Sequence, residues 1–306
     1  MHFLYLIRYK NLLIIGLTQW LFKWILIDLF FKNSALSNTR FIYLILATIC
    51  IAAAGNIIND IQDVSIDRIN KPEKVIIGKK ISEKTANWFY ILLNIIGVAL
   101  GFYVASVVDK SSFAVLFVLI SGLLYYYSVS LKKVPLAGNI LISILVALTV
   151  LIVGIFTLLP IISDANQFLV KYVFKILFWY SCFAFYINLL RELIKDIEDV
   201  NGDYTGGVIS IPIVIGKKRT VKLVSILSIL PCSALFFVVY EYLYSYPFLN
   251  IYLLFAIMGP LLYVSITAWS AKKKKEYTRL STLLKLIMVL GVLSIIVVRY
   301  TLFQKL

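Results

Sequence analysis

Long apolar runs recur along the whole chain, and they constrain its fold more than any other feature. A run of about 20 residues, wound as a helix, crosses the ~30 Å hydrocarbon core of a bilayer. The runs span residues 11–31, 40–60, 86–108, 112–131, 138–160, 169–194, 220–243, 249–270 and 282–303. Hydrophobic residues make up 61% of the chain and charged residues 15%, whereas soluble domains hold about 45–50% and 25%. The sequence predicts an all-α integral membrane protein of about nine transmembrane helices, in a single domain over residues 1–306.

The first run follows two basic residues, as a secretory signal does, but it is too long for the apolar part of a signal and lacks a small-residue cleavage site. We therefore expect segment 11–31 to remain as the first helix. The cysteines, Cys50, Cys182 and Cys232, lie inside apolar runs, and His2 is the only histidine. This composition excludes thiolate and imidazole metal sites, so oxygen atoms must hold any bound metal.

Basic residues predict the orientation of the chain in the membrane. Of the 30 Lys and Arg residues, 22 fall in the N-terminal segment and in or beside the loops after the second, fourth, sixth and eighth runs. Cytoplasmic loops carry such an excess, so we expect these loops on the cytoplasmic face of a bacterial or archaeal cell (inner) membrane. The net charge of +15 then reflects topology and attraction to anionic lipid, and it gives no argument for nucleic-acid binding.

An acidic segment occurs twice. Residues 60–67 read DIQDVSID, and residues 196–203 read DIEDVNGD. Four membrane helices with their loops fit into the separation of 136 residues, so both copies should leave the membrane on the same side. We therefore predict a parallel internal duplication, in which the second helix corresponds to the sixth.

The acidic residues are spaced as ligands on one face of a helix. Within each copy the three aspartates are three and four residues apart, so at about 100° per residue they form a column. Stacked like charges repel, and a cation is needed to offset them. Oxygen donors suit Mg²⁺, which proteins commonly bind through one or two carboxylates and substrate phosphates. The candidate metal ligands are Asn59, Asp60, Asp63, Asp67, Asp196, Asp199 and Asp203.

A simpler explanation of one cluster is a set of solvated loop acids that pair with neighbouring lysines. The repetition of the cluster at a membrane boundary, where acids are costly, favours a function. We therefore predict that Mg²⁺ bridges the two columns to the diphosphate of a substrate.

Basic side chains flank both clusters. A departing diphosphate gains negative charge as its C–O bond breaks, and Lys, Arg and Mg²⁺ stabilise that charge. The orientation rule explains any single basic residue equally well, but Arg191 and Lys195 lie among the acids. Aromatic side chains can shield an allylic cation, although packing and interfacial belts explain most of them. The candidate diphosphate ligands are Arg8, Arg68, Lys74, Tyr127, Lys132, Arg191 and Lys195.

These motifs resemble those of the UbiA-type membrane prenyltransferases. That family's N-x-x-x-D-x-x-x-D signature stands here as Asn59, Asp63 and Asp67, and its D-x-x-x-D signature as Asp199 and Asp203. Segment 127–139, with Tyr127, Lys132 and Gly138-Asn139, is similar to the family's third landmark. The resemblance implies nine helices around a central cavity that opens laterally to lipid, and Mg²⁺-dependent transfer of an isoprenoid chain. It implies catalytic roles for Asp63, Asp67, Asp199, Asp203 and Lys132.

Within this superfamily, segments 67–72 and 191–203 are most similar to archaeal-type digeranylgeranylglyceryl phosphate synthases. The resemblance implies geranylgeranyl diphosphate as the prenyl diphosphate donor and geranylgeranylglyceryl phosphate as the lipophilic acceptor. The chain departs from that group at Lys74-Val75, where Arg-Pro is usual, and at Ser210-Ile211-Pro212. Lysine keeps the charge of arginine but loses its bidentate fork. A quinone precursor or a haem-type acceptor fits the same mechanism.

A secondary transporter is the alternative from another functional class, because transporters also contain repeats and membrane-embedded acids. Transporter sites, however, lie near the middle of the bilayer. Both acidic clusters here lie at the ends of predicted helices, where a soluble diphosphate can arrive while its prenyl tail stays in lipid. The position of the acids therefore favours the prenyltransferase.

Overall fold

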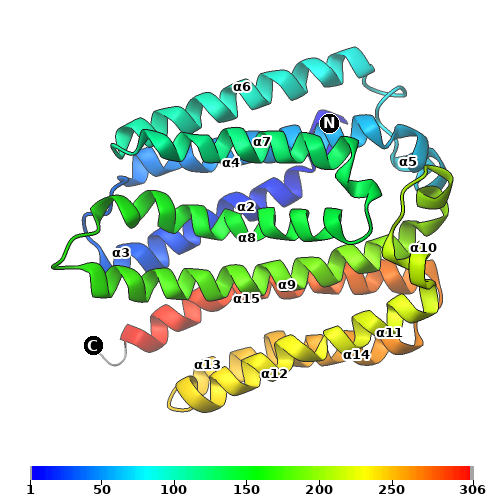
Figure 1. The fold of residues 1–306 in the computed structure, drawn as a ribbon. Helices are drawn as coiled ribbons and strands as arrows, with labels where there is room; N and C mark the ends of the chain where they lie inside the picture. The colour runs from blue at the N-terminus through cyan, green and yellow to red at the C-terminus, as the bar shows by residue number, and fades with distance from the viewer. Residues whose placement is uncertain (1, 304–306) are drawn as a thin grey trace.

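The computed structural model describes residues 2–303, which form a bundle of long helices lying side by side (Figure 1). Nine helices within these residues are long and apolar enough to cross a membrane. They are Tyr9–Phe30, Asn38–Gln62, Glu83–Val107, Ser111–Val129, Ala137–Ile161, Gln167–Thr205, Lys217–Leu243, Pro247–Ser270 and Lys274–Thr301. The predicted all-α fold and number of transmembrane helices are confirmed.

Some of these helices are single elements and others are composites. The single or nearly single ones are α4 (Asn38–Gln62), α6 (Glu83–Val107), α7 (Ala114–Val129) after the 3₁₀ turn η3 (Ser111–Phe113), α8 (Ala137–Thr157) before η5 (Leu159–Ile161), α9 (Gln167–Thr205) and α15 (Lys274–Phe303). The composites contain π-helical turns: α2 (Tyr9–Leu21), η1 (Phe22–Ile27) and α3 (Asp28–Phe30); α11 (Lys217–Leu227), α12 (Ile229–Val238) and η6 (Val239–Leu243); α13 (Pro247–Tyr252), η7 (Leu253–Met258) and α14 (Gly259–Ser270).

Short elements precede the first membrane helix or connect the later ones. They are α1 (His2–Leu6), α5 (Val64–Asn70), η2 (Pro72–Lys74), η4 (Leu131–Lys133) and α10 (Ile211–Ile215). Serines mark the start of two long helices, because Ser37 Oγ accepts a hydrogen bond from Arg40 N before α4 and Ser82 Oγ accepts one from Thr85 N before α6. In the described part of the chain, β pairing is limited to one isolated bridge between Ile77 and Ile81.

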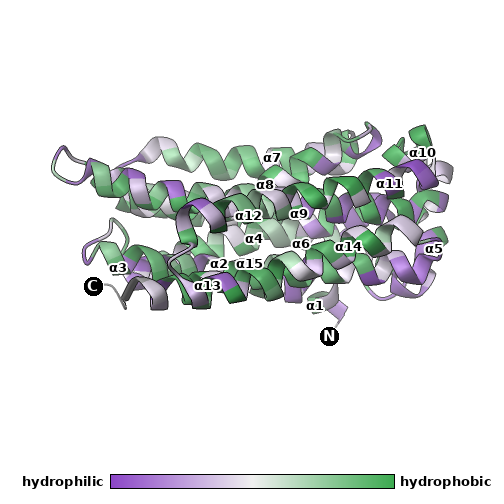
Figure 2. Ribbon diagram, turned by 90° about the horizontal axis from the view of Figure 1, so that it is seen from below, coloured by the Kyte–Doolittle hydropathy of each residue, from purple (hydrophilic) through white to green (hydrophobic). Residues whose placement is uncertain are grey.

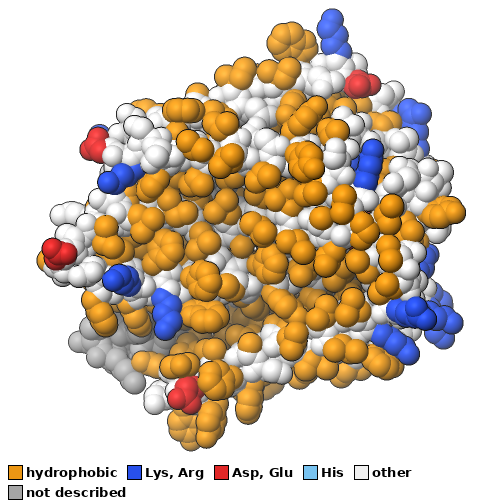
Figure 3. All heavy atoms as spheres, in the orientation of Figure 1, with side chains coloured by type: hydrophobic (Ala, Val, Ile, Leu, Met, Phe, Trp, Pro, Cys, Tyr) orange, Lys and Arg blue, Asp and Glu red, His pale blue; other side chains and the backbone are white. Residues whose placement is uncertain are grey.

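The surface of the bundle suits a lipid environment. Apolar residues fill the middle of the helices, and polar residues gather at the two ends (Figure 2). In Figure 3, hydrophobic side chains cover the centre of the face, and several Lys and Arg side chains lie at the right-hand edge, near α5 and α10. Large apolar side chains such as Phe255 (77% exposed) and Ile266 (72% exposed) point outward, as lipid-facing residues do.

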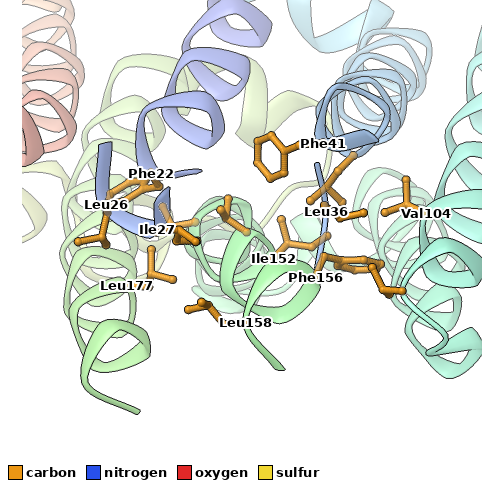
Figure 4. Packing of buried hydrophobic residues seen from close by; sticks show 14 of the residues in the cluster. Phe22, Leu26, Ile27, Leu36, Phe41, Val104, Ile152, Phe156, Leu158 and Leu177 are labelled. Carbon is orange, nitrogen blue, oxygen red and sulfur yellow. The ribbon is translucent and has the colours of Figure 1, made fainter. Parts of the chain in front are cut away.

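The largest hydrophobic cluster closes one end of the bundle. It packs Phe22 and Ile27 from η1, Phe41 from the start of α4, and Phe156 from the end of α8 (Figure 4). A second cluster fills the space between α9, α11, α14 and α15. The opposite end of the bundle is where α4 and α9 both finish, since the two helices run in the same direction (Figure 1).

Candidate active site

The first acidic cluster lies where α4 meets α5. α4 ends at Gln62, and Asp63 adopts φ −95° and ψ 3°, so the helix bends there. The predicted straight column of acids is therefore interrupted. Helical hydrogen bonds nevertheless continue across the bend, from Asp63 N to Asn59 O (2.9 Å) and from Asp67 N to Asp63 O (2.8 Å). These bonds keep Asn59, Asp63 and Asp67 one turn apart.

The second acidic cluster lies on the last turns of α9. The predicted apolar run ends at residue 194, and α9 continues beyond it to Thr205, so the acids lie on the helix as their spacing predicts. Its apolar face continues through Ile197 and Val200, which are buried. The acids lower the mean hydropathy of this segment, but they do not interrupt the helix. Asp196, Asp199 and Asp203 therefore stand on a continuous helix.

Asp63 accepts hydrogen bonds on both carboxylate oxygens. Lys132 Nζ, from η4, lies 2.5 Å from Asp63 Oδ1, and the two side chains are only 10% and 18% exposed. Asn59 Nδ2 donates to Asp63 Oδ2 at 2.9 Å. The structure thus joins the first signature to Lys132, which lies 69 residues further along the chain.

Asp199 is held from the segment that follows α5. Pro72 favours an extended conformation for the residue before it, and Lys71 adopts φ −148° and ψ 60°. Lys71 Nζ lies 2.5 Å from Asp199 Oδ2. Asn70 Nδ2 donates to the main-chain oxygen of Asp199 (2.8 Å), and Asn70 Oδ1 accepts from Gly202 N (2.9 Å). The first repeat is thereby fastened to the second.

Gly202 makes that contact possible. A Cβ atom at this position would lie 2.4 Å from Asn70 Nδ2, so a larger residue would displace the amide. Gly138 has a similar function at the start of α8, where a Cβ atom would lie 3.0 Å from Lys132 Cα and 3.1 Å from Tyr127 Cε2. These two glycines let the elements of the site approach closely.

Asp60 and Asp196 occupy equivalent positions in the two copies, and each has its own partner. Arg8 Nη2 lies 2.7 Å from Asp60 Oδ1. Arg8 has the left-handed conformation (φ 55°), a strained state that recurs at functional sites. Asn139 Nδ2, from the first turn of α8, donates to Asp196 Oδ2 at 2.8 Å.

Glu192 contacts both basic residues in the second half of α9, Arg191 and Lys195. Lys195 Nζ lies 2.8 Å and 3.0 Å from its two carboxylate oxygens, and Arg191 Nη1 lies 3.1 Å from Oε1. Tyr127 faces the same region, since Glu192 and Asp63 lie within electrostatic range of it. Tyr127 is half-buried, whereas the preceding residues Tyr125 and Tyr126 are exposed.

Asp203 and Asp67, the remaining acidic candidates, lie close to other acids of the site. Asp203 lies within electrostatic range of Asp199 and of Asp63, and so connects the two clusters. Burial, together with the charges of Asp63 and Asp60, raises the pKa of Asp67 to about 6. Both observations describe crowded negative charge, which a cation would relieve.

Two predicted diphosphate ligands, Arg68 and Lys74, form no ion pair with the acids of the site among the described residues, although Lys74 lines a small space together with Asp60 and Asp67. Arg68 is exposed and rests over the turn at Gly78. Lys74 is exposed and lines a cavity beside α15. Their diphosphate roles stay predictions.

The donor set fits a hard cation. The buried oxygens Asn59 Oδ1 and Asp199 Oδ1 have no hydrogen-bond partner, and buried polar atoms are normally satisfied. No three His, Cys, Asp or Glu side chains between residues 2 and 303 already converge as a metal-binding group. The carboxylates of Asp60, Asp63 and Asp199 instead face basic side chains, which would have to yield to a metal.

Two amide residues of the site, Asn70 and Asn139, were missed in the sequence. Both lie in segments that match family motifs, but an amide adds no charge to a pattern. Only the three-dimensional contacts with Asp199 and Asp196 identify them.

Comparison with known proteins identifies the family. The model of the UbiA prenyltransferase family matches residues 24–301, which include both acidic clusters, the end of the first membrane helix and the other eight membrane helices. The chain belongs to the UbiA prenyltransferase family. The predicted resemblance and the predicted enzyme class, a membrane prenyltransferase, are confirmed, and the transporter alternative is excluded.

Two curated relatives within this family carry the same name. Digeranylgeranylglyceryl phosphate synthase of Methanosphaera stadtmanae is 31% identical over 257 residues, which cover 82% of this chain and 86% of the relative. The enzyme of the same name from Saccharolobus solfataricus is 31% identical over 237 residues, covering 76% of this chain and 77% of the relative. The chain therefore aligns with most of the length of these relatives.

Solved structures show the same fold. A structure of digeranylgeranylglyceryl phosphate synthase has a TM-score of 0.64 at 25% identity and covers 97% of this chain and 96% of its own. The apo structure of a UbiA homologue from Aeropyrum pernix has a TM-score of 0.67 at 16% identity and covers 94% of this chain and 95% of its own. A UbiA homologue from Archaeoglobus fulgidus, solved with GPP and Mg²⁺, has a TM-score of 0.53 at 15% identity, covering 96% of this chain and 99% of its own.

Proposed function

We propose that this UbiA family member transfers a geranylgeranyl group from geranylgeranyl diphosphate to geranylgeranylglyceryl phosphate. The observation that carries the proposal is the pair of acidic clusters that face each other at one end of the bundle. Support for the substrates comes from the names of the relatives, which are digeranylgeranylglyceryl phosphate synthases. A quinone precursor or haem-type acceptor remains the second candidate, because it would use the same donor site.

The proposed metal site uses the ligands predicted from the sequence. Asn59, Asp63 and Asp67 would hold one Mg²⁺, and Asp199 and Asp203 a second, with Asp60 and Asp196 beside them. The buried, unpartnered oxygens of Asn59 and Asp199 support this assignment, as does the Mg²⁺ in the Archaeoglobus homologue. When bound, Mg²⁺ would neutralise the diphosphate and favour its departure.

The basic residues of the site would receive the departing charge. Lys132 pairs with Asp63 of the first cluster, and Arg191 and Lys195 pair with Glu192, one turn before the second cluster. A diphosphate held there would have cations on several sides. Arg8 and Tyr127 would complete this shell. These side chains are positioned before the substrate binds, which is the condition under which charge stabilisation is most effective.

The transfer itself replaces one C–O bond with another. The bond between C1 of the prenyl chain and the diphosphate oxygen breaks, the acceptor hydroxyl oxygen bonds to C1, and the hydroxyl proton is released. A carbon nucleophile would take the place of the oxygen in a quinone precursor. Apolar helix walls would limit capture of the allylic cation by water.

We further propose that the acidic clusters face the cytoplasm, in the cell membrane. The excess of Lys and Arg in the loops at that end supports this orientation. The single domain over residues 1–306 and the parallel duplication stay proposals as well. Their support is that α4 and α9 run in the same direction (Figure 1), and that each repeated acidic segment lies where one of these two helices ends.

Purified protein in nanodiscs, incubated with labelled geranylgeranyl diphosphate and a panel of acceptors, tests the proposal. We expect an ether-linked product with geranylgeranylglyceryl phosphate, identified by mass spectrometry. Product with a quinone precursor alone would reassign the acceptor, and no prenyl transfer to any acceptor would refute the proposed function.

A further inference from the structure

Lys285 is a basic residue well inside a membrane helix. It follows Lys274, the first residue of α15, by eleven positions, which places it about 16 Å along the helix axis. Its side chain is half-buried. Charged residues at such depths are costly and usually functional. The orientation rule explains the lysines at the start of α15, but it does not explain Lys285.

The hydrogen-bond partner of Lys285 in the described chain is a neutral amide. Lys285 Nζ lies 2.5 Å from Asn11 Oδ1 of α2, so this contact joins the first and the last membrane helix. No acidic side chain between residues 2 and 303 forms an ion pair with Lys285. Its charge therefore has no direct counter-ion in the protein.

Other cations surround Lys285. Arg191 and Lys10, both basic, lie within electrostatic range of it. Glu192 pairs with Arg191 and Lys195, which leaves Lys285 and Lys10 without an acidic partner among the described residues. The Nε atom of Arg191 is buried and has no hydrogen-bond partner in the described chain, although buried polar atoms normally have one. An anion would relieve this crowding of positive charge and satisfy the free N–H group.

The depth of this basic group relative to the acids follows from the packing of α15 on α9, which run in opposite directions (Figure 1). Thr278 Oγ1 donates to Glu198 Oε1 at 3.1 Å, so these residues lie at one level. Lys285 comes seven positions after Thr278, and Arg191 seven positions before Glu198, so Lys285 and Arg191 also share a level. Arg191 precedes Asp199 by eight positions, a rise of about 12 Å toward the middle of the membrane.

The basic group and the acidic clusters face the same interior. Tyr127 lies within electrostatic range of Glu192, of Asp63 and of Asp196, and Glu192 is the acid that contacts Arg191. A donor diphosphate held at the clusters, with its prenyl tail in lipid, directs C1 of the chain toward the middle of the membrane. C1 would then lie between the clusters and the basic group.

The proposed acceptor carries an anion close to its nucleophile. In geranylgeranylglyceryl phosphate, the phosphate and the free hydroxyl stand on adjacent carbons of the glycerol. A phosphate bound beside Lys285 would therefore hold the hydroxyl a few bonds away, on the side of the clusters where C1 lies. Both substrates would occupy one shared interior, with their phosphates at opposite ends of the reacting atoms.

We infer that Lys285, together with the free Nε edge of Arg191, binds the phosphate of the acceptor and selects for a phosphorylated lipid. The inference rests on the proposed function and deepens it by naming the group that recognises the acceptor. A structural alternative is that Lys285 only fastens α15 to α2 through Asn11. That role needs a hydrogen-bond donor but no positive charge, so variants can separate the two.

The test measures equilibrium binding of radiolabelled geranylgeranylglyceryl phosphate to protein in zwitterionic nanodiscs, without donor and in EDTA, so that the readout is independent of catalysis. The dephosphorylated analogue, geranylgeranylglycerol, is measured in parallel. Lys285→Gln removes the charge but keeps a donor for Asn11, and Lys285→Arg keeps the charge. Asn11→Ala removes the contact and leaves the charge. Lys275→Gln, exposed on the first turn of the same helix, is the matched charge control.

We expect Lys285→Gln to bind the phosphorylated acceptor about tenfold or more weakly, since a charge-assisted hydrogen bond is lost. Its binding of the dephosphorylated analogue and its KM for donor should stay unchanged. Lys285→Arg, Asn11→Ala and Lys275→Gln should bind the phosphorylated acceptor as wild type does.

Unchanged binding of the phosphorylated acceptor by Lys285→Gln would overturn the inference. An equal loss for both ligands, or an equal loss in Asn11→Ala, would also overturn it and assign Lys285 to helix packing. A raised KM for donor with normal acceptor binding would overturn it by assigning Lys285 to the donor diphosphate.

This design separates failure of the inference from failure of the proposed function. If wild-type protein transfers prenyl groups to the glyceryl phosphate acceptor but Lys285→Gln binds it normally, only the inference is wrong. If wild-type protein neither binds nor prenylates that acceptor, the proposed function is wrong, and the inference falls with it.

Discussion

Replacing Asn70 with alanine should weaken the clamp that fastens the first repeat to the second. The amide donates to Asp199 O (2.8 Å) and accepts from Gly202 N (2.9 Å), and Asn70 is only 9% exposed. A buried hydrogen bond contributes about 1 kcal/mol, so the loss of two costs about 2 kcal/mol of local stability. This corresponds to a factor of about 30 in the docked population.

The effect should appear in catalysis more than in folding, because hydrophobic packing elsewhere holds the bundle together. We expect kcat/KM of Asn70→Ala to fall by about 10- to 30-fold, with normal expression and a thermal midpoint in detergent within a few degrees of wild type. Radiolabelled product and differential scanning fluorimetry measure the two quantities.

Two further variants sharpen this test. Gly202→Ala should give the same loss from the opposite partner, since its Cβ atom would lie 2.4 Å from Asn70 Nδ2. Asn201→Ala, an exposed neighbour on the same helix, should be nearly neutral. Full activity in both Asn70→Ala and Gly202→Ala would refute the reasoning, and so would an equal loss in Asn201→Ala.

Three other predictions follow from the site and the orientation. Asn139→Ala should lower kcat/KM by about tenfold, because Asp196 loses the 2.8 Å hydrogen bond that orients it; wild-type kinetics would remove Asn139 from the site. Turnover should vanish in EDTA and return with Mg²⁺ or Mn²⁺, and activity that persists in chelator would exclude the metal site. Single cysteines introduced at Lys79 and Lys217 should react with an impermeant maleimide only from the cytoplasm, and one at Asp164 only from outside; the reverse pattern would invert the proposed topology.

Much of the fold could be predicted because lipid imposes one rule on every segment that crosses it. Each spanning segment must satisfy its own backbone hydrogen bonds, so a long apolar run implies a helix. The same rule does not predict where a helix ends, because a helix can continue beyond the apolar run that crosses the membrane. α9 continues to Thr205, although its hydropathy falls sharply at the acids, because a helix outside the hydrocarbon core needs no apolar surround. The apolar run therefore ends at residue 194, well before the helix does.

The acids of the site could also be predicted, since charge that repeats at helical spacing is visible in a sequence. Their partners could not. The pairing of Asp63 with Lys132 joins residues 69 positions apart, and that of Asp199 with Lys71 joins residues 128 positions apart. Such pairs depend on how the helices pack, as does the bend at Asp63. The cavity beside α15 likewise combines three segments whose proximity no local pattern reveals.

The most direct test of the account is the rate of prenyl transfer by Asp63→Asn and Asp199→Asn. Asparagine preserves volume, so Lys132 and Lys71 keep a hydrogen-bonding neighbour while the metal ligand loses its charge. We predict normal membrane insertion and a loss of at least about 100-fold in rate for each variant, which corresponds to about 2.7 kcal/mol of barrier. Asp164→Asn, in an exposed turn at the opposite end of the bundle, should be nearly neutral and serves as the control. Turnover close to that of wild type in both cluster variants would contradict the placement of the diphosphate site between α4 and α9.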